Sequence, residues 1–265
     1  MRKLLIVAVL ISLGTISLYG QGELNKEQKV FFRNEKSFGI LLNTDGIGIS
    51  YREAKRIDFR NKTLLEFDAG TLKAAKEYKQ SSPTNQGSSF IFGKLNSTFY
   101  LRAGIGHQHE LFKKADLGGI AVRYFFSAGP VLAIYKPIYY KVIYPLSPNT
   151  YEIRIEKFDT SIAIPQDIFS RASFTKGLDE TKVMPGLYAK FGFNFEYSKQ
   201  DKIIHAIELG GQVNAFPTKI PIMAGSDNKA LFFSLFVSYR FGIILDPLDP
   251  ESNKLSNIFR RKKND

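Results

Sequence analysis

The chain has 265 residues, of which 44% are hydrophobic, 14% aromatic and 23% charged; this suits one or two folded domains and excludes a disordered protein. It contains no cysteine, so a disulfide framework, a cysteine-ligated zinc and a thiol nucleophile are all excluded. The formal net charge of +12 suits nucleic acid, an anionic membrane surface or an acidic partner, and charge alone does not choose among them.

The first twenty residues have the three-part layout of a secretory signal peptide. A positive start at residues 1–3 precedes an apolar run at 4–13, and small and polar residues follow up to Gly20. The run is too short for a membrane-spanning helix, which takes roughly 20 apolar residues. We predict a signal peptide at 1–20 and a periplasmic N-terminal segment at 21–35, so nucleic acid is not expected as a partner.

Most of the remaining chain alternates between apolar and polar residues, which predicts β-strands. In the clearest run, Phe191, Phe193 and Phe195 share one parity, with Lys190 and Asn194 on the other. Most runs reach the ~9 to 11 residues that a tilted strand needs to cross a bilayer. Eight strands are predicted, at 36–43, 46–58, 63–72, 98–112, 118–135, 186–198, 202–216 and 229–242.

The connections between these strands alternate in length. Short polar turns are expected at 59–62, 113–117 and 199–201, and long loops at 73–97, 136–185 and 217–228. Short periplasmic turns and long external loops are typical of transmembrane barrels.

The predicted fold class is therefore all-β: an eight-stranded antiparallel transmembrane β-barrel with long external loops, located in the outer membrane. The barrel spans residues 36–242 with an external insertion at 136–185, and a periplasmic tail follows at 243–265. A soluble sandwich or lipocalin-like barrel also alternates and remains the alternative.

The polar parity of these strands predicts an ion-paired lumen. Eight strands enclose an interior just wide enough for side chains to fill, and charges buried there must be paired. We therefore predict a closed lumen, with a small pore for ions or small solutes as the alternative. The predicted lumen network is Arg52, Glu66, Asp68, Arg102, Arg123, Lys190, Glu196, Glu208 and Arg240.

Candidates for catalysis or metal binding are few. His107 and His109 share one face of a strand, but no third metal ligand is assignable. Lipid A acylation and deacylation barrels resemble this chain in size and strand count, yet their working residues sit at the outer-leaflet end. Here His107, His109 and His205 lie toward the periplasm, so we predict no catalytic residues, no cofactor and no metal. A lipid-modifying outer-membrane enzyme is the second alternative.

The insertion at 136–185 is predicted to bind an envelope protein partner. Its first half reads as a hairpin that turns at 146–149, and aromatic anchors in a polar surround are typical of recognition surfaces. A cap on the barrel mouth is the alternative, and the basic end of the tail, 260–263, is a second candidate contact. The predicted partner-binding residues are Tyr139, Tyr140, Tyr144, Tyr151 and Arg154.

The signal peptide, the eight strands, the loop asymmetry and the terminal stripe of Leu235, Val237, Tyr239 and Phe241 together resemble a small outer-membrane β-barrel protein of the Bacteroidota type. The stripe is similar to the terminal-strand signal that the barrel assembly machinery reads. PorT-like and PorG-like barrels, which belong to type IX secretion, are similar in size and layout. The resemblance implies a non-enzymatic structural, assembly or secretion-machinery component of the envelope, surrounded by outer-membrane lipid.

Overall fold

The computed structural model describes residues 34–75, 77–81, 89–115, 118–147, 150–159, 165–198, 203–225 and 228–245. The predicted signal peptide at 1–20 and the basic residues at 260–263 lie outside these ranges.

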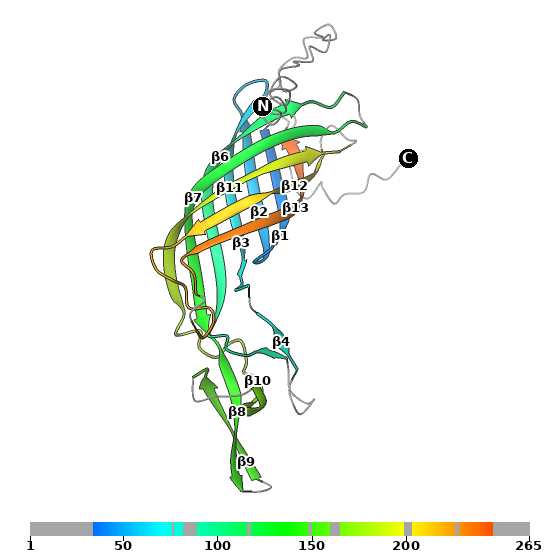
Figure 1. The fold of residues 1–265 in the computed structure, drawn as a ribbon. Helices are drawn as coiled ribbons and strands as arrows, with labels where there is room; N and C mark the ends of the chain where they lie inside the picture. The colour runs from blue at the N-terminus through cyan, green and yellow to red at the C-terminus, as the bar shows by residue number, and fades with distance from the viewer. Residues whose placement is uncertain are drawn as a thin grey trace, which may run out of the picture. The chain divides into compact units, whose positions relative to one another are not determined.

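Eight antiparallel strands form a closed barrel in the order β1-β13-β12-β11-β7-β6-β3-β2 (Figure 1). The pairing of β1 with β13, from Asn34 opposite Leu245 to Asn43 opposite Phe236, closes the barrel. All eight predicted strands and the predicted fold class are confirmed. The strands are β1 (Asn34–Asn43), β2 (Gly46–Arg56), β3 (Asn61–Leu72), β6 (Asn96–Phe112), β7 (Ala121–Pro137), β11 (Lys182–Glu196), β12 (Ile203–Ala215) and β13 (Leu231–Leu245).

The barrel extends slightly beyond the predicted bounds of 36–242. β1 begins at Asn34 and β13 ends at Leu245, because these two residues still pair with each other. β11 begins at Lys182, which lies opposite Tyr135 of β7, so the external insertion is shorter than the predicted 136–185. Backbone pairing continues there although the apolar alternation that marks a strand in the sequence has ended.

The outside of the barrel is apolar. Side chains that alternate with the buried ones point outward, among them Ile105, 71% exposed, and Phe233, 69% exposed. Soluble proteins rarely expose a contiguous apolar surface of this extent, whereas an outward-facing apolar band characterises outer-membrane barrels. The chain is therefore a transmembrane β-barrel of an outer membrane, as predicted, and not a soluble sandwich. None of the described residues forms a helix long and apolar enough to cross a membrane.

The insertion after β7 forms a separate three-stranded sheet, here called the external sheet, in the order β10-β8-β9. Its strands are β8 (Tyr139–Ser147), β9 (Thr150–Lys157) and β10 (Ile168–Arg171), and a short 3-10 helix, Pro165–Asp167, precedes β10. One face packs on the short strand β5 (Phe90–Ile91), which pairs with β4 (Lys79–Gln80), through a small core that includes Phe90, Tyr140 and Ile168. Because only Ile138 separates β7 from β8, the sheet is joined directly to the barrel wall.

Candidate functional site

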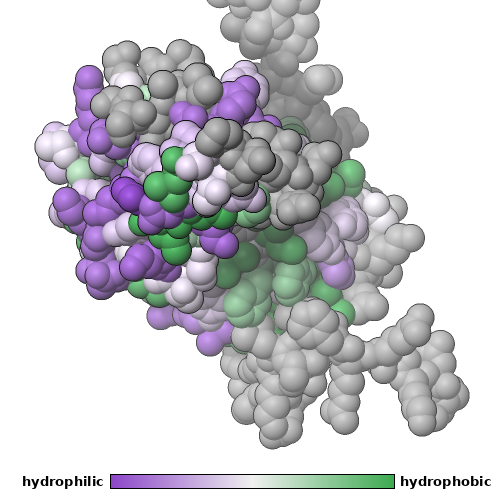
Figure 2. Space-filling view, turned by 90° about the horizontal axis from the view of Figure 1, so that it is seen from below, coloured by the Kyte–Doolittle hydropathy of each residue, from purple (hydrophilic) through white to green (hydrophobic). Residues whose placement is uncertain are grey.

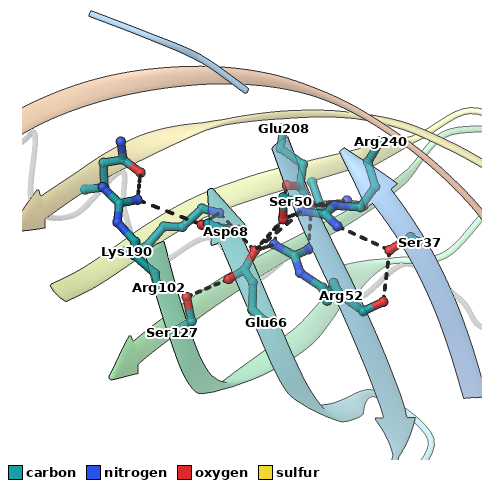
Figure 3. A network of polar contacts seen from close by, with 12 residues as sticks. Ser37, Ser50, Arg52, Glu66, Asp68, Arg102, Ser127, Lys190, Glu208 and Arg240 are labelled. Atoms are coloured by element: carbon teal, nitrogen blue, oxygen red, sulfur yellow. Dashed lines mark hydrogen bonds and ion pairs between the residues drawn. The ribbon is translucent and has the colours of Figure 1, made fainter. Parts of the chain in front are cut away.

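Seven of the nine predicted lumen residues meet in one group, here called the central network (Figure 3). Their side chains are almost fully buried and come from strands all around the barrel. The members are Arg52, Glu66, Asp68, Arg102, Lys190, Glu208 and Arg240.

Glu66 is at the centre of this network. One of its oxygens, Oε1, lies 2.8 Å from Arg52 Nη2, 2.9 Å from Lys190 Nζ and 3.4 Å from Arg240 Nη2. Ser127 Oγ donates a hydrogen bond to the other oxygen at 2.8 Å. Three cations and the hydroxyl groups of Ser127 and Ser50 therefore hold a single carboxylate that has no access to water.

Glu208 forms the second anionic centre. Its Oε1 accepts hydrogen bonds from Arg52 Nη1 at 2.6 Å, Arg240 Nε at 3.1 Å and the Asn194 side-chain amide at 2.8 Å. Arg52 thus bridges Glu66 and Glu208 and ties β2 to β3 and β12. Side chains that sequence reasoning missed, including Ser50 and Asn194, complete the network; their inward parity was the signal that would have found them.

Aromatic rings fill the space between the charges. The Arg102 guanidinium lies 4.0 Å from the Tyr100 ring centroid and 5.3 Å from that of Tyr188, and it donates a hydrogen bond to Gln212 at 2.7 Å. Gly104 makes room for this stack, since a Cβ atom there would lie 2.1 Å from the Tyr188 hydroxyl oxygen. At this level, therefore, charged and aromatic side chains fill the interior and do not surround an open channel.

Arg123 and Glu196 are not part of the central network. They belong to a second group, here called the end cluster, at the short-turn end of the barrel, where Arg123 Nη1 lies 2.6 Å from Glu196 Oε2. The predicted lumen network is thus divided into two separate groups. The parity of a residue indicates that its side chain points inward, but it does not specify the height of that side chain along the barrel. The other members, which sequence reasoning missed, are Glu35, Lys62, Glu110 and Lys114.

An apolar layer closes the opposite end of the lumen. The loop between β12 and β13 folds inward, and its residues Ile220 and Ile222 are 0% and 2% exposed. Its backbone is tied to the barrel rim, since Leu95 N–H donates to the Ile222 carbonyl at 2.9 Å. At the same rim, burial raises the pKa of Asp45, against the opposing influence of Ser234 and Arg102.

The histidines face outward. His107 Nε2 and His109 Nδ1 lie 3.0 and 2.7 Å from the same atom, Asn61 Oδ1, and His205 Nδ1 lies 2.8 Å from the Tyr239 hydroxyl. Within the ranges that the structure describes, no three histidine or acidic side chains are grouped to hold a metal ion.

The five predicted partner-binding residues occupy different environments in the external sheet. Tyr140 is only 1% exposed, and its hydroxyl donates to the carbonyls of Ile91 and Lys94. Burial raises the pKa of Tyr140. Tyr140 is therefore a core residue and cannot contact a partner, which corrects its predicted role.

The other four remain accessible to different degrees. Tyr139 and Tyr144 are half-buried and donate hydrogen bonds to Glu180 and Glu156. Tyr151 and Arg154, both on β9, are exposed. Sequence reasoning missed the exposed Ile153 and Ile155 beside them, although their alternation with charged residues was visible.

No protein-family model matches the sequence, and no curated protein matches the chain. Among solved structures, Ail, the attachment invasion locus protein of Yersinia pestis, is similar with a TM-score of 0.39 and 8% identity, covering 81% of this chain and 99% of that chain. Neisserial surface protein A has a TM-score of 0.37 and 9% identity, covering 81% and 97%. The N-terminal β-barrel domain of OprF from Pseudomonas aeruginosa has a TM-score of 0.33 and 8% identity, covering 81% and 100%. Likeness at these values carries no argument about function.

Proposed function

We propose that this chain is a non-enzymatic outer-membrane barrel that serves the envelope as a structural or assembly component. The barrel is a closed anchor, and the external sheet offers the surface to which an envelope protein binds. The observation that carries this proposal is the filling of the lumen at three levels, by the end cluster, the central network and the apolar layer.

A pore of useful size requires a wider barrel or an open interior. Here Arg52, Glu66 and Glu208 bridge strands across the lumen at distances of 2.6 to 2.8 Å, which leaves no room for a hydrated ion to pass between them. The secretion-machinery role that the resemblance to PorT-like and PorG-like barrels implies is a finer form of the same proposal.

Two measurements test the proposal. Purified protein in a planar bilayer should show no stable conductance steps, while a conducting porin in the same bilayer serves as positive control; large, reproducible steps would favour the pore. In the native envelope, replacing residues 143–154 with a short Gly/Ser link should leave a heat-modifiable barrel and remove partner crosslinking. This replacement leaves Tyr140 and Val142 in place, because their side chains belong to the core of the external sheet. Full crosslinking by that variant would contradict the proposed binding surface.

A further inference from the structure

The outer edge of β9 has no neighbouring strand among the described residues, because β9 ends the sheet order β10-β8-β9. An edge strand presents a row of unpaired backbone N–H and C=O groups, and natural proteins protect such edges with charged side chains, proline, bulges or a covering segment. β9 is eight residues long and contains no proline, and its charged side chains, Glu152, Arg154, Glu156 and Lys157, admit only a partner strand of complementary charge. It therefore retains the features of a strand that can accept a partner strand.

The two faces of β9 differ in chemistry. Tyr151, Ile153 and Ile155 point to one face and are 62%, 41% and 51% exposed. Glu152 and Arg154 alternate with them on the other face, where Arg154 Nη2 lies 2.7 Å from Glu152 Oε2. Figure 2, which views the molecule from the end that carries β9, shows hydrophobic side chains exposed between hydrophilic ones. A partner strand must match an apolar stripe on one face and alternating charges on the other.

We propose that β9 pairs antiparallel with β9 of a second copy of this chain, centred on Ile153. This inference rests on the proposed role of the external sheet as a binding surface. In this register Glu152 lies opposite Arg154 of the second copy, and Arg154 opposite its Glu152. Tyr151 lies opposite Ile155, and Ile153 opposite itself. Opposite charges and aromatic–β-branched pairs both stabilise neighbouring strands.

The neighbouring registers that keep the faces matched are poorer. Centring the pair on Glu152 places Glu152 opposite itself, so like charges repel. Centring the pair on Arg154 places Arg154 opposite itself and Glu152 opposite Glu156, so like charges repel. Centring it on Ile155 keeps Arg154 opposite Glu156 but places Lys157 opposite Ile153, which interrupts the apolar stripe. The β9 sequence is thus self-complementary in one register.

Antiparallel pairing also fixes the direction of the two molecules. β8 runs away from the barrel and β9 returns toward it (Figure 1), so two antiparallel β9 strands carry their barrels at opposite ends. Barrels joined in this way lie in two facing membranes, and the pairing bridges those membranes.

Charge variants test the pairing in full-length protein by analytical ultracentrifugation in detergent. Wild type should form a concentration-dependent dimer. Glu152→Arg alone and Arg154→Glu alone each place like charges opposite each other and should raise the dimer Kd roughly tenfold or more. Mixing these two variants should restore dimers, and the double variant E152R/R154E should dimerise with itself but not with wild type.

Glu156→Gln is the matched control: in the Ile153-centred register Glu156 lies opposite Thr150, and glutamine keeps an oxygen that accepts the hydrogen bond from Tyr144, so the dimer should stay intact. Wild type that stays monomeric at all concentrations, variants that dimerise unchanged, or loss of the dimer on Glu156→Gln would each overturn the proposal. Vesicles carrying outward-facing protein should cluster with wild type and not with Glu152→Arg alone. Suppose that wild type stays monomeric, shows no conductance in a bilayer and still crosslinks to an envelope partner through the hairpin. That result would refute self-pairing only, whereas conductance steps would refute the proposed function.

Discussion

Glu66→Gln tests whether the central network holds the barrel together. The substitution keeps the size and one oxygen acceptor of the side chain but removes the charge that faces Arg52, Lys190 and Arg240 at 2.8, 2.9 and 3.4 Å. Breaking a buried ion pair from one side costs about 3–5 kcal/mol, because the remaining charge is left uncompensated. At about 2–4 °C per kcal/mol for a chain of this size, the melting midpoint should fall by roughly 6–20 °C.

The assay is heat-modifiable gel migration and denaturant unfolding in detergent. Glu53→Gln is the control, since its ion pair with Lys36 at 3.2 Å is partly exposed and such pairs contribute about 0–1 kcal/mol. If Glu66→Gln does not fold, Ser127→Ala removes one 2.8 Å hydrogen bond to the same carboxylate and should cost about 1 kcal/mol. A Glu66→Gln barrel within ~1 kcal/mol of the Glu53→Gln variant would refute the view that the network stabilises the closed barrel.

Three further substitutions address other levels of the structure. Gly104→Ala should lower the unfolding free energy by about 1–3 kcal/mol in denaturant titration, because the new Cβ collides with the Tyr188 hydroxyl. Burial raises the pKa of Asp45, so its ionisation weakens the fold as pH rises through that pKa. Asp45→Asn should therefore raise the melting midpoint at pH 7, and the difference should shrink below pH ~4. Tyr140→Phe removes the hydroxyl that donates to the carbonyls of Ile91 and Lys94 and should speed proteolysis of the external sheet, whereas Tyr151→Ala should not.

The strands were predictable because successive side chains of a strand point alternately into the lumen and out of the barrel. The sequence therefore alternates between polar and apolar residues along each strand. Residues 186–198 were predicted and β11 covers Lys182–Glu196. The error lies at the ends: pairing begins four residues before the apolar pattern and stops two residues before the predicted end. The residues that point inward were equally visible. Where charged residues alternate with phenylalanines, the phenylalanines face the lipid and the charged residues must face the lumen. Sequence therefore indicated which side chains enter the lumen.

Sequence did not indicate which of these side chains meet. Arg52 and Glu208 are 156 positions apart and come together only because of the stagger between strands, which no local pattern records. Arg123 shows the same limit, since it lies near the start of β7 and so falls in the end cluster. The role of Tyr140 failed for a related reason: both faces of the hairpin are aromatic, and only packing against Phe90 distinguishes the buried face.

The position of Glu66 links charge pairing to barrel closure. Its three cations come from β2, β11 and β13, and of these only β2 is a direct neighbour of β3. No hairpin or partial sheet brings all three cations to this carboxylate, so its full set of partners forms only when the barrel has closed. A one-residue slip of any strand would turn its inward charge toward lipid, at a cost of about 2–4 kcal/mol for a lysine or arginine at the bilayer midplane. The network therefore specifies both closure and register, while the external sheet, which has its own core around Tyr140, is free to carry a binding surface without altering either.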